Sequence, residues 1–296
     1  MLRTPLRRSE WLSAASNADV SIKLEGIQTT FSYKVRGALN AVLRLGDGSG
    51  RPPALVTASA GNHGRGLAFA ASMARLPLIV YVPEAAPRVK LDAMRAEGAE
   101  LVVCRDYDEA EARAKEHGAQ GTALYVSPYS HPDIIAGAGT VALEILEQDP
   151  AIEVVVCPVG GGGLISGTAI AAGPAVATWG VETESSCPFT QGFAAGHIVP
   201  IRVLPSLADG LVGNLDPETI TFDLVRRYVA GVVTVTEEAI ATAMAKLVAE
   251  ERVIAEGAAA TAIAGVLGGR LPIAGRRVAV ILSGANVDPG KLRDLL

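Results

Sequence analysis

The sequence lacks several features that would assign it to particular classes of protein. Only three of its 296 residues are cysteine, too few and too scattered for a disulfide framework or a zinc site, and a reducing cytoplasm suits them best. The net charge of −5 leaves no basic excess to neutralise phosphates, which argues against a nucleic-acid partner. No apolar run approaches the roughly 18 residues needed to cross a bilayer, so we expect no membrane partner.

What the sequence does contain is the balance of a soluble globular protein, with 49% hydrophobic and 19% charged residues and enough length for two lobes. Apolar runs alternate with amphipathic stretches almost from end to end, which is typical of βαβ units and a parallel sheet. The predicted strands are 21–25, 54–58, 77–82, 100–104, 123–127, 153–159, 178–182 and 277–282. The predicted helices are 33–44, 62–74, 87–97, 107–117, 131–147, 163–172, 237–249 and 257–267. Residues 185–215 show little period, and we expect an extended connection at the rim of an active site.

Two glycine-rich turns follow predicted strands. The first is Thr57-Ala58-Ser59-Ala60-Gly61-Asn62-His63-Gly64, and the second, called here the glycine loop, is Gly160, Gly161, Gly162 and Gly163, followed by Leu164. Backbone N–H groups of such a run converge on an anion at a helix N-terminus, where the helix dipole also favours negative charge. A tight turn is the other interpretation, and a dinucleotide site would need a G-x-G-x-x-G spacing that this run lacks. The apolar strand before it and the small-residue helix after it favour phosphate binding.

Two further residues stand where α/β proteins carry chemistry. Lys34 follows Ser32, a residue type that caps helices, so we expect Lys34 in the first turn of a helix. The dipole disfavours a cation there, which suits an amine that must lose its proton, although a solvated surface lysine is the simpler interpretation. Ser283 follows the last predicted strand, at the end where parallel sheets bind ligands, but serine before glycine is also common in turns.

These segments, in this order, resemble the fold-type II pyridoxal-phosphate enzymes, and among them the threonine and serine dehydratase branch that also contains serine racemase. The matching residues span nearly the whole chain: Thr4-Pro5-Leu6, Lys23-Leu24-Glu25 with Gln28, Ser32-Tyr33-Lys34 with Arg36-Gly37-Ala38, Ser59-Ala60-Gly61-Asn62-His63, Gly137-Ala138-Gly139-Thr140, the glycine loop with Leu164, Gly180-Val181-Glu182, Ala208-Asp209-Gly210, Glu256-Gly257-Ala258 and Ser283-Gly284-Ala285-Asn286. The resemblance implies a two-lobed α/β fold of the tryptophan synthase β type, with a parallel-sheet core in each lobe. It also implies a large cofactor-binding domain of residues 1–46 and 139–296, a small domain of residues 47–138, and the cofactor in the cleft between them.

The resemblance implies roles for individual residues. Lys34 would carry pyridoxal 5'-phosphate as a Schiff base and remove the Cα proton of the substrate. The glycine loop and Leu164 would hold the cofactor phosphate, Asn62 would bond the ring hydroxyl, and Ser283 would meet the pyridine nitrogen. A hydroxyl does not enforce a protonated pyridine, and elimination of a β-leaving group tolerates the weaker electron sink. The substrate carboxylate would be bound by Ser59, Ala60, Gly61, Asn62 and His63.

The implied activity removes water and then ammonia from a β-hydroxy amino acid, such as threonine, serine or a relative, and leaves a 2-oxo acid. Serine racemases resemble this chain but commonly carry a serine immediately before the Gly-Asn of the first loop, and its hydroxyl protonates the opposite face of Cα. Ala60 has no exchangeable proton at that position, so we expect a dehydratase rather than an amino acid racemase. A non-catalytic cofactor-binding protein is the third hypothesis, disfavoured because lysine, phosphate loop and ring partner are all present.

Departures from the relatives concern the substrate and a metal. Ser130 and His131 replace the acidic pair of a Pro-Phe-Asp-Asp-like turn, so His131 is a candidate substrate-binding residue, with a solvent-facing histidine as the alternative. Some relatives bind a divalent cation near the Ala-Asp-Gly motif. Asp209 is present, but the sequence does not gather the several oxygens that such a cation needs, so a metal stays open. We also expect a homo-oligomer and, from the length, no appended regulatory domain.

Overall fold

The computed structural model describes residues 1–46, 50–86 and 88–295. The chain divides into two compact units. The larger consists of Leu2–Tyr33 and Ala138–Leu296, and the smaller consists of Lys34–Gly137 together with Met1. Each unit contains a sheet, as expected from the alternating pattern of the sequence.

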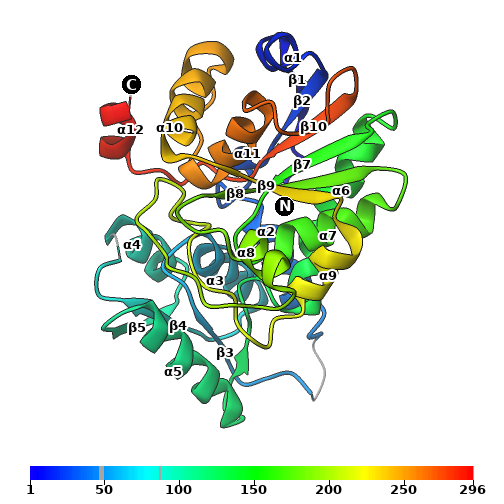
Figure 1. Cartoon of the computed structure of the whole chain (residues 1–296). Coiled ribbons are helices and arrows are strands. Elements are labelled where there is room, and N and C mark those ends of the chain that lie inside the picture. Colours follow the sequence, from blue (N-terminus) through cyan, green and yellow to red (C-terminus); the bar gives the residue numbers. More distant parts are fainter. Residues whose placement is uncertain (47–49, 87, 296) are drawn as a thin grey trace. The chain divides into compact units, whose positions relative to one another are not determined.

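The sheet of the larger unit has six strands in the order β1-β2-β10-β7-β8-β9 (Figure 1). All neighbours are parallel except β1, which runs antiparallel to β2. The strands are β1 (Leu6–Arg8), β2 (Asp19–Leu24), β7 (Val154–Pro158), β8 (Ala177–Thr183), β9 (Gly231–Val235) and β10 (Arg277–Leu282). Every residue of β7 is buried, as its run of valines predicts for a strand covered on both faces.

Helices cover both faces of this sheet, and the two-residue period of β7 separates their cores. Val154 and Val156 pack in one hydrophobic cluster with residues of α10 and α11, whereas Val155 packs in another with residues of α6, α7 and α9. The helices are α1 (Glu10–Ser16), α6 (Pro132–Gln148), α7 (Gly163–Ala172), α8 (Pro188–Ala195), α9 (Thr221–Tyr228), α10 (Glu237–Lys246) with a π-helical turn (Leu247–Glu251), α11 (Gly257–Leu267) and α12 (Pro289–Leu295); a 3-10 turn covers Glu25–Ile27.

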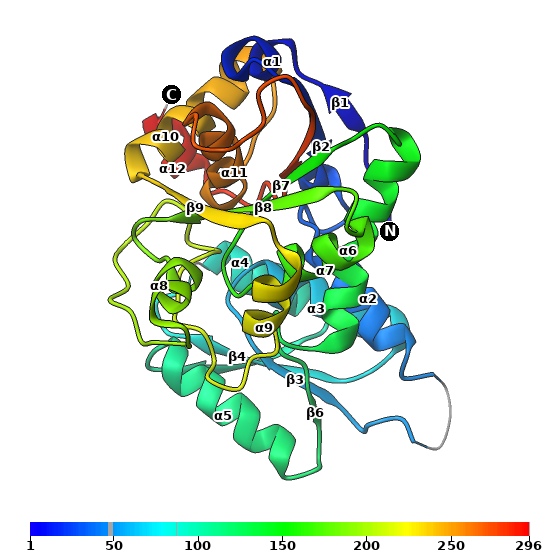
Figure 2. The ribbon, with the colours of Figure 1, turned by 45° about the vertical axis from the view of Figure 1, so that its right-hand side comes forward.

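The smaller unit has four parallel strands in the order β5-β4-β3-β6. They are β3 (Leu55–Ala58), β4 (Leu78–Pro83), β5 (Glu100–Cys104) and β6 (Leu124–Tyr125), and the helices are α2 (Lys34–Leu43), α3 (Asn62–Ala74), α4 (Arg88–Ala96) and α5 (Tyr107–Ala119). Figure 2 shows α3 and α5 on opposite sides of β3 and β4. Leu55 and Val80 pack with residues of α2 and α3, while Val56 and Ala58 pack with residues of α5.

The predicted elements are all present, and the structure corrects several details. The helix predicted over 87–97 is α4, although its predicted first residue, Pro87, lies outside the described residues. The segment 185–215 is not wholly irregular, because it contains α8, which begins with Pro188 at a helical N-terminal position. The prediction of Ser32 as a helix N-cap is wrong. Its hydroxyl is buried without a hydrogen-bond partner among the described residues, and its backbone pairs with Gly284.

The division into units differs from the expected domains at α2. The sequence places residues 1–46 in the larger domain, whereas contacts group α2 with the smaller unit. The physical reason is the packing of α2 on α3, in which Val35, Ala38 and Val42 share one core with α3. The expected boundary at Asp47 itself lies outside the described residues.

Candidate active site

Lys34 is the first residue of α2, and contacts within the smaller unit hold both its backbone and its amine. Its Nζ donates a hydrogen bond to the carbonyl oxygen of Pro128, at 2.7 Å. At the backbone, a Cβ on Gly66 of α3 would lie 3.1 Å from the nitrogen of Val35 and 3.2–3.3 Å from the carbonyl of Lys34. Glycine at position 66 therefore allows α3 to approach the start of α2 closely.

The first glycine-rich turn joins β3 to α3. The hydroxyl oxygen of Ser59 accepts hydrogen bonds from the amides of Gly61 and Gly64, at 3.2 and 3.1 Å, and so holds the turn closed. A Cβ on Gly64 would meet the carbonyl oxygen of Ser59 at 2.6 Å, so this turn also depends on a glycine. The turn places Asn62 at the start of α3, where the helix dipole favours an anion.

His63 lies beneath this turn and is 2% exposed. Its Nε2 lies 3.1 Å from the hydroxyl of Thr57 and 3.3 Å from the carbonyl oxygen of Val126. Burial, followed by the positive charge of Lys34, lowers the pKa of His63 to about 3. His63 is therefore a neutral imidazole at physiological pH, close enough to Lys34 to feel its charge.

His131 lies just before α6 and is half-buried. Its Nδ1 accepts a hydrogen bond from the amide of Asp133, at 3.2 Å, so the N–H of a neutral ring is on Nε2. The carboxylate of Asp133 pairs with Arg44, at 2.7 Å. His131 also contributes to the lowered pKa of His63, which places the two imidazoles in one neighbourhood of the smaller unit.

In the larger unit, the glycine loop joins β7 to α7. Gly162 has a φ of +84°, and a Cβ there would lie 2.5 Å from the ring of Phe189 and 3.0 Å from Thr221. A Cβ on Gly160 would lie 2.9 Å from the Cα of Leu211. The carbonyl of Gly161 accepts a hydrogen bond from Thr221 at 2.8 Å. The loop is thus a backbone cradle at the start of a buried helix, which fits a phosphate-bearing cofactor.

Ser283 follows β10 in the same sheet, and β10 and β7 are parallel neighbours, so Ser283 and the glycine loop lie at the same edge. Ser283 is 4% exposed, and its carbonyl accepts a hydrogen bond from the amide of Tyr33, at 3.0 Å. A Cβ on Gly284 would collide with the carboxylate of Glu256. Tyr33, next to Lys34 in the chain, has its pKa raised by burial and then by Cys157 and Glu256.

The structure therefore brings the predicted residues together in two sets, one in each unit. The smaller unit gathers Lys34, His131 and the turn from Ser59 to His63, and the larger gathers the glycine loop, Leu164 and Ser283. Sequence reasoning missed Pro128 and Thr221, and it gave Glu256 no role beyond membership of a motif. Pro128 acts through a backbone carbonyl and Thr221 lies far along the chain, so neither leaves a local signal.

No group of three His, Cys, Asp or Glu side chains that could hold a metal ion occurs among the described residues, around Asp209 or elsewhere. The carboxylate of Glu182 binds the start of α8: it accepts hydrogen bonds from the amides of Phe189 and Thr190, both at 2.9 Å, and from the hydroxyl of Thr190 at 2.6 Å. Burial raises the pKa of Glu182. Within the described chain, no helix has the length and apolar character needed to span a membrane.

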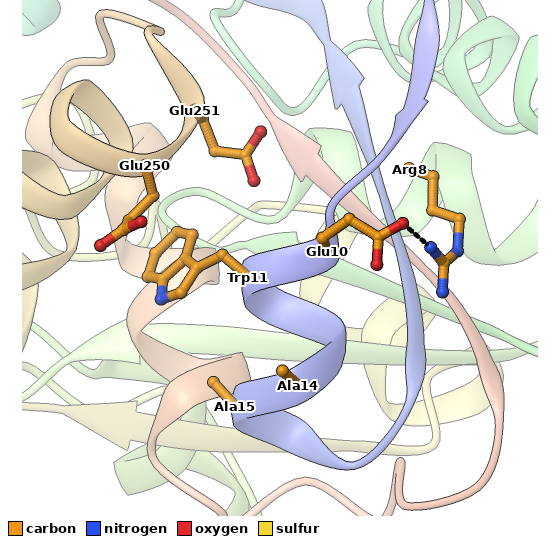
Figure 3. Close-up of a pocket in the computed structure, with 7 residues that line it drawn as sticks. All are labelled: Arg8, Glu10, Trp11, Ala14, Ala15, Glu250 and Glu251. Carbon is orange, nitrogen blue, oxygen red and sulfur yellow. Dashed lines mark hydrogen bonds and ion pairs between the residues drawn. The ribbon is translucent and has the colours of Figure 1, made fainter.

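A separate surface pocket of about 790 Å³ lies against α1 in the larger unit (Figure 3). In this view Trp11 extends from α1 toward the carboxylate of Glu250 on the π-helical turn. The lining residues are Arg8, Glu10, Trp11, Ala14, Ala15, Glu250 and Glu251. None of the residues that the sequence nominated lines this pocket.

The two parallel-sheet units and the two residue sets are those expected of a pyridoxal-phosphate enzyme. Comparison with known proteins identifies the family. The family model described as "Pyridoxal-phosphate dependent enzyme" matches residues 1–284, so the chain belongs to this family and its cofactor is pyridoxal phosphate.

Its relatives include dehydratases and a racemase. The chain is 39% identical over 290 residues to the L-threonine ammonia-lyase of Thermotoga maritima, covering 97% of this chain and 72% of that protein. It is 34% identical to the L-threo-3-hydroxyaspartate ammonia-lyase of Saccharomyces cerevisiae, covering 99% and 91%. The structure of maize serine racemase superposes with a TM-score of 0.92 at 30% identity, covering 99% and 91%. The expected fold-type II architecture is confirmed.

Proposed function

We propose that this protein is an ammonia-lyase that converts a β-hydroxy amino acid, such as threonine or serine, into a 2-oxo acid and ammonia. The observation that carries the proposal is the composition of the first glycine-rich turn. It lies in the same unit as an amine, Lys34, but has a methyl group at Ala60, where a racemase needs a proton donor for the opposite face of Cα. The relatedness to L-threonine ammonia-lyase supports the same choice.

Residues of both sets would bind the cofactor. The glycine loop and Leu164 would hold the cofactor phosphate through backbone N–H groups, and Ser283 would bond the pyridine nitrogen. Lys34 would carry the cofactor covalently, and Asn62 would bond the ring hydroxyl. When bound, pyridoxal phosphate supplies a ring that takes up the electrons of the Cα–H bond.

The smaller unit binds and deprotonates the substrate. The amides of the turn from Ser59 to His63 bind the substrate carboxylate at the start of α3, where the dipole favours an anion. The amine of Lys34 takes the Cα proton and becomes an ammonium, which then gives that proton to the β-hydroxyl, so that the hydroxyl leaves as water and the amine is regenerated. Hydrolysis of the released product consumes one water and yields the 2-oxo acid and ammonia.

A spectroscopic experiment tests whether Lys34 carries the cofactor. The purified protein should be yellow, should be bleached by borohydride, and should yield a reduced cofactor adduct on the peptide that contains Lys34. Lys34→Ala should bind the cofactor without this adduct and should lose activity, whereas Lys291→Ala, on α12, should behave as the parent. A protein that stays colourless after reconstitution would overturn the proposal, whereas a yellow protein that turns over no substrate would support the non-catalytic alternative.

Substrate assays separate the lyase from the racemase. A panel of β-hydroxy amino acids, L and D, threo and erythro, should yield 2-oxo acid faster than the opposite enantiomer. Racemisation that outruns elimination would show that Ala60 does not decide the reaction. Ala60→Ser should raise racemisation relative to elimination, because it supplies the missing hydroxyl.

A second candidate substrate is a β-hydroxy amino acid with an acidic side chain, and His131 favours it. His131 and Lys34 both influence the buried His63, and the nearby carboxylate of Asp133 is paired with Arg44. A substrate side-chain carboxylate would accept a hydrogen bond from Nε2 of His131, and one relative is an L-threo-3-hydroxyaspartate ammonia-lyase. His131→Asn should lower kcat/KM for 3-hydroxyaspartate about tenfold and leave that for threonine within about twofold, since one charge-assisted hydrogen bond is lost. Equal losses for both substrates would exclude this role.

We further propose that the protein works in the cytoplasm as a homo-oligomer of two or more copies. The three free cysteines suit a reducing compartment. Light scattering coupled to size-exclusion chromatography tests the assembly, and a monomer mass would contradict it.

A further inference from the structure

The imidazole of His63 carries a buried nitrogen that the proposed mechanism does not use. Thr57 donates its hydroxyl hydrogen to the carbonyl of Val126, at 2.8 Å, so its oxygen can only accept from His63. Both neighbours of Nε2, the Thr57 hydroxyl and the Val126 carbonyl, are therefore acceptors, and Nε2 must carry the ring hydrogen. Nδ1 is then a bare acceptor, and it has no hydrogen-bond partner among the described residues.

An unpaired buried acceptor destabilises the folded state, so its retention calls for a donor that arrives during function. The surroundings of His63 indicate which donor that is. His63 and Gly66 lie three residues apart and share one face of α3, and Gly66 packs against the backbone of Lys34. The charge of Lys34 is also the second-largest influence on the pKa of His63.

The two side chains are also tied to the same short segment. Lys34 donates to the carbonyl of Pro128, and His63 donates to the carbonyl of Val126, two residues earlier. This segment follows β6, the neighbour of β3 from which the first glycine-rich turn departs. Backbone packing, electrostatic influence and a shared anchor thus all place the His63 ring beside the Lys34 side chain.

We propose that Nδ1 of His63 is the second acceptor, after the Pro128 carbonyl, for the Lys34 ammonium that forms when Lys34 takes up a proton. An ammonium has three N–H donors and needs acceptors in a buried site. A neutral imidazole nitrogen supplies one without adding a negative charge. Burial keeps His63 from competing for the proton, because its pKa of about 3 leaves Nδ1 unprotonated across the physiological range. His63 is thus a positioning residue that sets the proton affinity of Lys34.

Two conservative variants separate this role from simple anchoring of the loop. In His63→Asn the amide oxygen overlays Nδ1, so the acceptor is kept while the hydrogen bond to Val126 is lost. In His63→Gln the terminal amide overlays Nε2, so the bond to Val126 is kept while the acceptor at Nδ1 is lost. The proposal therefore predicts opposite outcomes for the two variants.

The primary measurement uses the cofactor-free protein and does not depend on activity. The pKa of the Lys34 amine is obtained from the pH dependence of its competitive acetylation, read by mass spectrometry of the Lys34 peptide. His63→Gln should lower this pKa by about one unit, a tenfold loss of proton affinity, and His63→Asn should leave it within about 0.3 unit. Equal pKa values in the parent and in His63→Gln, or a larger shift in His63→Asn, would overturn the proposal.

The kinetic consequence rests on the proposed lyase function and is measured separately. In the loaded enzyme, His63→Gln should shift the pH profile of kcat in the same direction as the acetylation pKa, with rescue in His63→Asn. If the acetylation result holds but no substrate is turned over, the acceptor role stands and the lyase assignment fails. If turnover is normal and the acetylation pKa is unchanged, the lyase assignment stands and the acceptor role fails.

Discussion

Gly162 and Gly173 stand at the two ends of α7 and both have positive φ, 84° and 73°. Gly162 lies in the left-handed helical region, and Gly173, with a ψ of 178°, lies in a region that glycine alone adopts readily, so an alanine at either position is strained by roughly 1–3 kcal/mol. Only at Gly162 would its Cβ also meet Phe189 and Thr221, while nothing lies within 4 Å at Gly173. Gly162→Ala should therefore weaken cofactor binding at least about tenfold, because the cradle must open. Absorbance titration with pyridoxal phosphate measures this, and an equal loss in Gly173→Ala would show that only backbone strain matters.

The lowered pKa of His63 predicts how stability depends on pH. The unfolded imidazole binds a proton below its ordinary pKa of 6.5, whereas the folded one resists protonation down to about 3. The unfolded state therefore binds more protons between these values, and the free energy of unfolding should fall by up to about 1.4 kcal/mol per pH unit as the pH decreases from 6.5 toward 3.

Urea unfolding at several pH values between 4 and 8 tests this contribution. His63→Gln should reduce the slope of the unfolding free energy against pH by up to about 1.4 kcal/mol per pH unit, the equivalent of one proton. His197→Gln, which changes an exposed histidine, should leave this slope as it is in the parent. Identical slopes in the parent and in His63→Gln would show that His63 is protonated in the folded protein.

At the residue scale, the sequence was most informative where chemistry and backbone geometry need one residue type. Lys34 begins α2 and the glycine loop joins β7 to α7, as the predicted elements indicate. The state of His63 could not be predicted, because its tautomer depends on Thr57 and on the carbonyl of Val126, in the segment that follows β6. Ser32 was wrongly predicted as a helix N-cap, because serine commonly caps helices. In the structure its hydroxyl is buried by tertiary packing and caps no helix.

At the scale of single elements, α8 depends on a carboxylate from a neighbouring strand. Glu182, at the end of β8, accepts the first amides of α8 in place of a local cap. Glu182→Ala would leave these amides and the Thr190 hydroxyl without an acceptor, so the free energy of unfolding should fall by about 2–4 kcal/mol. Glu184→Ala, two residues on and exposed, should change it by less than about 0.5 kcal/mol. Urea unfolding compares the two, and similar small losses would contradict the capping role.

Most of the helices that the sequence did not predict are short. Strands such as β5 and β10 and helices such as α3, α7 and α11 were predicted with their observed bounds, because apolar period and terminal signals agree there. The helices α1, α8, α9 and α12 are short, with seven or eight residues, and carry too few turns for a clear period. The strand β9 was missed although it reads Gly-Val-Val-Thr-Val, and most of its residues are half-buried at the sheet edge.

At the scale of the whole molecule, α6 belongs to two hydrophobic cores. Ile134, near its start, packs in the core of the smaller unit, whereas Val141 and Ile145 pack in a core of the larger one. The sequence predicted one continuous helix over this range, which is correct, but an amphipathic period does not reveal that its two halves serve different cores. The cores share no residue, so each unit can open with its own free energy.

Hydrogen exchange in urea below the unfolding midpoint should therefore resolve two opening free energies, one for the amides of β3 and β4 and another for those of β7 and β10. Leu67→Ala removes a fully buried side chain from the smaller unit and should lower the first by about 2–5 kcal/mol while leaving the second unchanged. Val141→Ala should do the reverse, because Val141 is buried in the core of the larger unit. Since α6 spans both units, its amides near Ile134 should follow the first opening and those near Ile145 the second. A single opening free energy for both sheets, lowered equally by either variant, would mean that α6 couples the two cores into one cooperative unit.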